Sequence, residues 1–96
     1  MQVSACVISF QEEDRIERCL ASLAFCDEVF VLDSGSTDRT RERALAMGAR
    51  VEVQPFLGHR RQKQRAAELA EHDWILSLDS DECLSAALRD ELEALV

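Results

Sequence analysis

The chain has 96 residues, of which 47% are hydrophobic and 31% are charged, a balance that fits one small globular domain and excludes a disordered segment. Its net charge of −8 argues against non-specific binding to nucleic acid, which attracts basic proteins, so we expect no nucleic-acid partner.

The first third of the chain predicts a strand, a helix and a second strand. Residues 2–10 are a nearly continuous apolar, β-branched run, typical of a strand buried on both faces. Residues 11–14, with acids at positions 12–14, predict the first turn of a helix, and an apolar stripe over residues 16–23 continues it. Residues 28–32 are a second buried run.

The middle of the chain predicts a turn, a helix and a third strand. The turn over residues 34–38 offers Ser36 or Thr37 as the N-cap of a helix that ends at Gly48, a well-placed C′ glycine. Residues 50–54 then alternate as a strand does, and we expect this strand to lie nearer an edge of the sheet.

The last part predicts a helix over residues 60–71, a buried strand over 73–78 and an amphipathic helix over 84–95. Strict alternation of strand and helix predicts an α/β fold: three layers, with a mostly parallel four-stranded sheet and helices on both faces. We expect the large side chains of Phe10 and Trp74 to belong to its core.

Acidic and polar residues follow three of the four predicted strands. Because the carboxyl ends of parallel strands meet at one edge, where open α/β sheets bind ligands, we expect these residues to form one site. They are Gln11 and Glu12 after the first strand, Asp33 and Ser34 after the second, and Asp79, Ser80 and Asp81 after the fourth.

The carboxylates of Asp79, Asp81 and Glu82 repel one another unless a cation lies between them. Carboxylate oxygens suit Mg²⁺ or Mn²⁺, so this stretch predicts a divalent metal site. The alternative is an acidic turn at the end of a strand. Asp33 could accept hydrogen bonds from a base or ribose, or it could cap the next helix.

Phosphate binding by a glycine loop is excluded, because the chain has neither a G-x-G-x-x-G nor a G-x-x-x-x-G-K-[ST] motif. Phosphates would then be held by the metal and by basic side chains. Arg60, Arg61, Lys63 and Arg65 supply such a cluster, although a solvated helix face would look the same.

The chain contains four cysteines, without a C-x-x-C pair or histidines at zinc spacing, which indicates reduced, structural thiols. No apolar run approaches the ~20 residues of a membrane span, and the first residues lack the features of a signal peptide. We expect a cytoplasmic protein, which would meet a membrane by lying on it or through sequence not present here.

Three segments together, residues 7–13, 31–38 and 74–82, resemble family 2 glycosyltransferases. Members of this family are inverting enzymes of the GT-A fold, with a Rossmann-like half that binds a nucleotide sugar. Residues 56–65 look most like the branch that adds glucose to the lipopolysaccharide inner core. The resemblance covers only the N-terminal part of a full-length member, so we expect residues 1–96 to be a single nucleotide-sugar-binding domain of a longer transferase.

The resemblance implies a role for each matching residue. Asp79 and Asp81 match the D-x-D motif, which holds Mg²⁺ or Mn²⁺ and the donor diphosphate, and the catalytic base is expected outside this chain. The donor implied is UDP-glucose, and the acceptor a saccharide or a lipid-linked one such as lipopolysaccharide core. The nucleotide-binding residues implied are Ser9, Phe10, Gln11, Glu12, Asp33, Ser34, Lys63, Asp79 and Ser80.

Two other α/β classes place charged residues at the strand ends, but their patterns differ from this chain. A receiver-like interaction module would need a lone acid after its middle strand, but the strand over 50–54 ends in Gln54 and Pro55. A nucleotidyltransferase would carry a glycine- and lysine-rich loop after the first strand, where residues 11–14 have neither. A non-catalytic nucleotide-binding module stays as the alternative, and an unpaired sheet edge would favour a homodimer.

Overall fold

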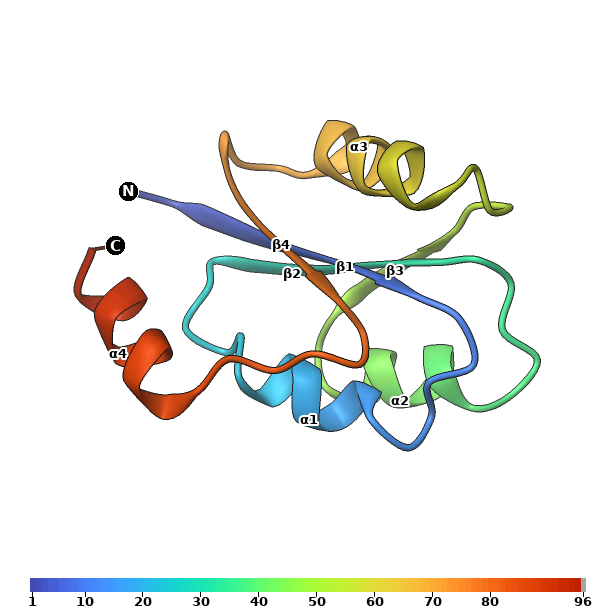
Figure 1. The fold of residues 1–96 in the computed structure, drawn as a ribbon, viewed down its shortest axis with the longest axis horizontal. Helices are drawn as coiled ribbons and strands as arrows, with labels where there is room; N and C mark the ends of the chain where they lie inside the picture. The colour runs from blue at the N-terminus through green and yellow to red at the C-terminus, as the bar shows by residue number, and fades with distance from the viewer. Residues whose placement is uncertain (96) are drawn as a thin grey trace.

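The computed structural model describes residues 1–95, in which four strands alternate with four helices (Figure 1). This alternation confirms the α/β class expected from the sequence. The strands are β1 (Val3–Ser9), β2 (Glu28–Asp33), β3 (Arg50–Val53) and β4 (Trp74–Asp79), and the helices are α1 (Ile16–Ala21), α2 (Thr40–Ala46), α3 (His59–Leu69) and α4 (Ala86–Leu95).

The sheet is parallel throughout, with the strand order β3-β2-β1-β4. The chain runs outwards from β1 through β2 to β3, and α3 then carries it back to the free side of β1, where β4 pairs. Because β2 and β3 lie on one side of β1 and β4 lies on the other, the strand order reverses between β1 and β4. This is the switch point of the sheet. All seven residues of β1 are buried, as expected for a central strand.

Helices cover both faces of the sheet, and each face has its own apolar core. Helices α1 and α2 lie on one face, where Ile16 and Ala44 belong to the same buried cluster as Val31 (Figure 1). Helix α3 lies on the opposite face, where Ala66 packs in a cluster with Phe30. The three-layer arrangement is therefore confirmed.

Strand β4 is not the buried strand that its apolar sequence predicts. In the described chain it pairs only with β1, and the side chain of Trp74 at its start is 62% exposed. The expectation that Trp74 belongs to the core is therefore wrong, because strand order places this run at an edge. The expectation for β3 is confirmed, since β3 forms the other edge.

Helix α4 forms where the apolar period predicts it, but none of its described residues is buried. Leu88 is 44% exposed and Leu95 is 68% exposed, while Leu84, just before the helix, packs against the α1 side of the core. In Figure 1 this helix lies to the left of α1. None of the helices in residues 1–95 is both long and apolar enough to cross a bilayer.

Helix α1 begins at Ile16, later than the acidic residues at 11–14 predict. Residues 11–15 form a turn instead, in which the backbone N–H groups of Arg15 and Ile16 both donate to the carbonyl of Glu12, at 3.0 and 2.9 Å. This turn is fixed by contacts with a distant loop, and helix propensity contains no information about those contacts.

Helix α2 has Arg39 at its N-cap position, without a capping bond from that side chain, so the expectation of Ser36 or Thr37 as the N-cap is wrong. The Asp38 carboxylate accepts a hydrogen bond from the N–H of Thr40 at 3.0 Å, and the Thr40 hydroxyl donates to the same oxygen. The latter bond is the main cause that lowers the pKa of Asp38. Gly48, with φ of +87°, follows the helix as expected.

At the amino end of the sheet, Glu28 is a buried carboxylate that contacts four donor atoms of three residues. It accepts hydrogen bonds from Ser4 Oγ at 2.8 Å, from the Glu71 N–H at 2.9 Å and from Arg50 Nε at 3.0 Å, and Arg50 Nη2 lies 3.0 Å from it. Burial raises the pKa of Glu28, but these hydrogen bonds and the charge of Arg50 outweigh burial and leave the pKa below its usual 4.5.

We expect Glu28→Gln to lower the free energy of unfolding by about 2 kcal/mol at pH 7, because a charge-assisted set of hydrogen bonds is lost. Since folding lowers the pKa of Glu28, its stabilisation is present above pH 4.5 and is lost as the pH falls through the folded-state pKa. Urea unfolding between pH 3 and 7 checks this.

The matched control for Glu28→Gln is Glu52→Gln, whose half-exposed carboxylate lies 2.7 Å from Nη1 of the same Arg50. We expect a loss below about 0.5 kcal/mol for the control, as for other surface pairs. A constant difference between wild type and Glu28→Gln across the whole pH range would contradict the assigned role.

The four cysteines are all free, which agrees with thiols used as small apolar side chains. Burial raises the pKa of Cys6 to about 11 and that of Cys19 to about 12. Both therefore remain neutral thiols near pH 7.

Candidate functional site

A cleft of about 570 Å³ opens at the carboxyl ends of β1, β2 and β4, beside the switch point of the sheet. Open parallel sheets bind ligands at this position, because the loops diverge there. Most of the residues predicted for a nucleotide site line it. The lining residues are Ile8, Ser9, Phe10, Glu12, Ser34, Phe56, His59, Asp79, Ser80 and Asp81.

Three carboxylates meet at the end of β4. Asp79 pairs with Ile8 in the sheet, and the chain then turns so that Asp79, Asp81 and Glu82 offer oxygens within 4.8 Å of one another. Glu82, which does not belong to the D-x-D motif itself, thus lies in the same group as the two aspartates. One of its oxygens accepts a hydrogen bond from the Asp79 N–H at 2.8 Å, which holds the turn.

Asp79 contributes a buried oxygen that has no hydrogen-bond partner, Oδ1. Lys63 Nζ lies 3.3 Å from this atom, close enough for an ion pair but without the angle of a hydrogen bond. A buried carboxylate oxygen with unused acceptor capacity, next to two further carboxylates, suits a hard divalent cation. The residues present therefore fit Mg²⁺ or Mn²⁺, with Asp79 and Asp81 as ligands and Glu82 beside them.

The acids of the cleft differ in how far their charge is compensated. Glu12 pairs with Arg15 at 2.9 Å, and Asp79 pairs with Lys63. Asp81 is exposed and, among residues 1–95, has neither an ion pair nor a hydrogen bond to its side chain. Its free carboxylate is the group that gains most from a bound cation.

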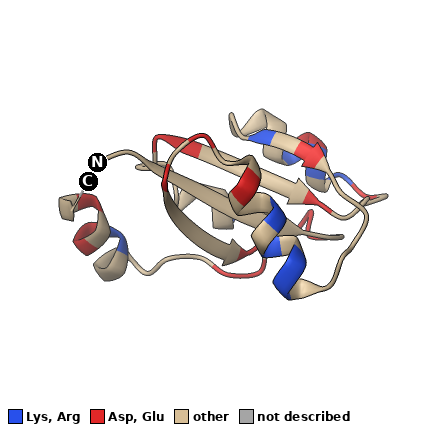
Figure 2. Cartoon of the chain, turned by 90° about the horizontal axis from the view of Figure 1, so that it is seen from above, with Lys and Arg blue, Asp and Glu red and all other residues tan. Residues whose placement is uncertain are grey.

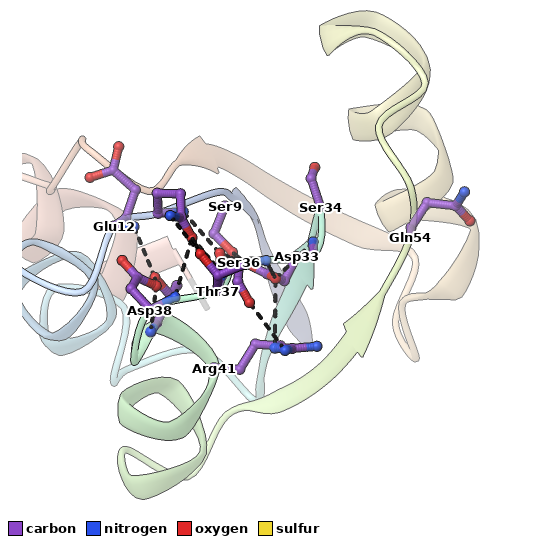
Figure 3. A network of polar contacts seen from close by, with 12 residues as sticks. Ser9, Glu12, Asp33, Ser34, Ser36, Thr37, Asp38, Arg41 and Gln54 are labelled. Carbon is purple, nitrogen blue, oxygen red and sulfur yellow. Dashed lines mark hydrogen bonds and ion pairs between the residues drawn. The ribbon is translucent and has the colours of Figure 1, made fainter.

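Asp33 is fully buried, and both of its oxygens are used by the protein (Figure 3). Oδ1 accepts hydrogen bonds from the hydroxyls of Ser9 and Ser36, at 2.8 and 2.6 Å, and Oδ2 accepts from the N–H groups of Gly35 and Ser36, at 3.0 and 2.7 Å. Arg41 Nε lies 3.8 Å from Oδ2. Asp33 thus shapes the turn after β2 without lining the cleft, and its contact with a base stays a prediction.

Hydrogen bonds join the loop after β1 to the loop after β2 (Figure 3). The Gln11 N–H donates to Ser36 Oγ at 2.8 Å, its side-chain oxygen accepts from the Thr37 N–H at 2.6 Å, and the Glu12 N–H donates to Thr40 Oγ1 at 2.8 Å. Gln11 has φ of +53°, a conformation that such contacts must hold in place. Its side chain is directed at the second loop, and its contact with a nucleotide stays a prediction.

Gln62 of α3 is a buried residue that sequence reasoning missed. Its amide nitrogen donates to Ser34 Oγ at 3.3 Å and to the Gln54 carbonyl at 3.1 Å, and its oxygen accepts from the Leu57 N–H at 3.1 Å. It therefore fixes Ser34, in the cleft wall, to the loop before α3. The available signal was its position one turn before Ala66, on the inward helix face.

We expect Gln62→Ala to lower the free energy of unfolding by about 2 kcal/mol, because the partly buried backbone groups of Gln54 and Leu57 lose their partner. Gln64→Ala, an exposed change on the same helix, is expected to have an effect below about 0.5 kcal/mol. Urea denaturation of both variants tests the structural role of Gln62. Equal free energies of unfolding for Gln62→Ala and Gln64→Ala would contradict this role.

Aromatic side chains line the same cleft as the acids. Phe10 is 56% exposed, so the expectation that it belongs to the core is wrong, and it stands in the cleft as its second, nucleotide-binding interpretation requires. Phe56 and His59, which sequence reasoning did not single out, pack edge to face, with their ring centroids 5.2 Å apart. Exposed aromatic faces in a cleft offer stacking surfaces to a base or a sugar.

A comparison with known families accounts for this arrangement. Residues 4–96 match the sequence profile of glycosyl transferase family 2. The chain belongs to this family. Membership favours a transferase over the receiver-like and nucleotidyltransferase alternatives.

Individual relatives agree with the family match. The chain is 46% identical over 93 residues to an uncharacterized glycosyltransferase of Rickettsia bellii, covering 96% of this chain and 32% of that protein. It is 36% identical over 101 residues to the lipopolysaccharide core biosynthesis glycosyltransferase LpsC of Rhizobium meliloti, covering 100% of this chain and 37% of that protein. The chain thus spans about a third of the length of these relatives.

Solved structures of glycosyltransferases confirm the GT-A fold. Glucosyl-3-phosphoglycerate synthase from Mycobacterium tuberculosis, in complex with UDP, matches with a TM-score of 0.75 and 32% identity over 84% of this chain and 34% of the synthase. Another structure of that synthase contains Mn²⁺, UDP and glucosyl-3-phosphoglycerate. S. aureus TarS 1-349 matches with a TM-score of 0.76 and 27% identity over 98% of this chain and 32% of that one.

Proposed function

We propose that residues 1–96 are the donor-binding domain of an inverting glycosyltransferase that takes its sugar from UDP-glucose. The observation that carries this proposal is the buried Oδ1 of Asp79, which accepts no hydrogen bond, within a cluster of acids at the switch point. The synthase structures with UDP, Mn²⁺ and UDP-glucose support the choice of donor and metal.

Each part of the cleft has a distinct task in this proposal. A divalent cation on Asp79 and Asp81 would offset the charge of the donor diphosphate and of the departing UDP. Ser9, Phe10 and Ser34 line the remainder of the cleft and would surround the nucleoside. Asp33, Gln11 and Gln62 keep the loops that carry these residues in place.

We propose that the base of the transfer step lies outside these 96 residues. It would be a carboxylate that accepts the proton of an acceptor hydroxyl, whose oxygen attacks the anomeric carbon opposite the leaving group. The bond between that carbon and the diphosphate oxygen then breaks, UDP leaves and the configuration is inverted. The similarity to LpsC supports a saccharide or lipid-linked acceptor such as lipopolysaccharide core.

A cytoplasmic location at the inner face of the membrane follows from such an acceptor, and we propose peripheral association there.

We also propose a homodimer through the exposed edge of β4, because unpaired edge strands attract partners. Sedimentation velocity tests the dimer, and a monomer at every concentration would contradict it.

Calorimetry with UDP, in the presence of Mn²⁺ or of a chelator, tests the donor-binding role. We expect UDP to bind when Mn²⁺ is present, and GDP, which has the same diphosphate, to bind more weakly. Absence of UDP binding with Mn²⁺ would refute the role of the domain. Equal affinities for UDP and GDP would refute a site built for uridine.

A further inference from the structure

Large apolar side chains are exposed at the mouth of the cleft, in the loop between β3 and α3. Phe56 is 54% exposed and Leu57 is 44% exposed, and Phe10, which lines the same cleft as Phe56, is 56% exposed. Neighbouring large apolar side chains that are exposed to solvent on a small domain indicate a surface that binds a protein or a membrane.

Uncompensated positive charge lies directly beside this loop. Arg60 and Arg61, in the first turn of α3, are exposed and form no ion pair within residues 1–95, whereas Lys63 and Arg65 pair with acids. Figure 2, with α3 nearest the viewer, shows the blue segments toward the start of this helix. On a chain with a net charge of −8, this end of α3 is the part that attracts an anionic surface.

We propose that Phe56, Leu57, Arg60 and Arg61 dock the protein on an anionic phospholipid bilayer, with the loop between β3 and α3 toward the headgroups. The two apolar side chains would enter the boundary between headgroups and acyl chains, and the two guanidinium groups would pair with lipid phosphates. The inference deepens the proposed function, because it places the donor cleft where a lipid-linked acceptor lies.

Co-sedimentation with lipid vesicles, without nucleotide or metal, tests the docking surface. We expect the chain to bind vesicles that contain phosphatidylglycerol and not to bind vesicles of phosphatidylcholine alone. The bound chain should dissociate as the salt concentration is raised. The double variant Arg60→Glu, Arg61→Glu is expected to lose affinity by roughly 30-fold or more, since each arginine near an anionic surface contributes about fivefold. Leu57→Ser is expected to lower the affinity for these vesicles several-fold.

Matched controls lie on the opposite face of the sheet. Arg18→Glu on α1 repeats the charge reversal, and Leu45→Ser on α2 removes an apolar side chain that is 58% exposed. Both are expected to bind as the wild type does, and circular dichroism checks that every variant is folded.

Several results would overturn the proposal: no binding, equal binding to both kinds of vesicle, or equal losses in the control variants. Displacement of the protein by inorganic phosphate, but not by chloride at equal ionic strength, would assign Arg60 and Arg61 to a soluble phosphorylated ligand and would also overturn it. The readout is independent of UDP. A chain that binds UDP with Mn²⁺ but no vesicles refutes this inference alone.

Discussion

Replacing Asp81 by alanine is expected to weaken the binding of UDP in the presence of Mn²⁺ by at least about 100-fold, or ~2.7 kcal/mol. Asp81 is exposed and has no partner of its own among the described side chains, so its removal costs the fold little. The loss should therefore appear in affinity and not in stability. Calorimetry and urea unfolding of the same variant separate the two effects.

Asp90→Ala on α4 is the matched control for Asp81→Ala, because it removes one exposed carboxylate from a helix that does not line the cleft. We expect it to bind UDP as the wild type does. Equal affinity of Asp81→Ala and Asp90→Ala would show that the acid cluster does not carry the metal-dependent site.

Replacing Asp33 by alanine is expected to lower the free energy of unfolding by about 3–5 kcal/mol, the largest stability effect that we predict. The change would leave two hydroxyl and two backbone N–H donors without their acceptor in a buried position. Asp33→Asn keeps the shape and one acceptor oxygen, so a smaller loss of about 1–2 kcal/mol is expected. An alanine variant within about 1 kcal/mol of the wild type would contradict the structural role.

Much of the fold follows from local patterns. Alternating strand and helix signals predicted the order of the elements, and the run of acids at Asp79 and Asp81 predicted the end of β4 and the position of the cleft. These features could be predicted because residue periodicity and strand ends are local properties of the chain.

Burial could not be predicted from composition alone. Trp74 and Phe10 are as apolar as core residues, but strand order places Trp74 at an edge, and Phe10 lies just beyond the end of β1. Likewise, the period of α4 shows that one face is apolar without showing what covers it.

The polar framework of the site was the least accessible part. Gln62 contacts Ser34 and Gln54, and Gln11 contacts Thr37, through hydrogen bonds between segments that only the folded chain brings together. A sequence shows which residues can form such bonds, but not which partners they meet. Asp33 was singled out for the site, yet its burial and saturated carboxylate became visible only in the fold.

The coupling between Mn²⁺ and UDP tests the central claim most directly, because a cation shared by the acids and the diphosphate must link the two binding equilibria. Electron paramagnetic resonance measures free Mn²⁺ in the presence and absence of UDP. We predict that UDP tightens Mn²⁺ binding to the wild type and that this coupling disappears in the double variant Asp79→Asn, Asp81→Asn. Mn²⁺ binding that UDP leaves unchanged, or a coupling that survives in the double variant, would contradict the account.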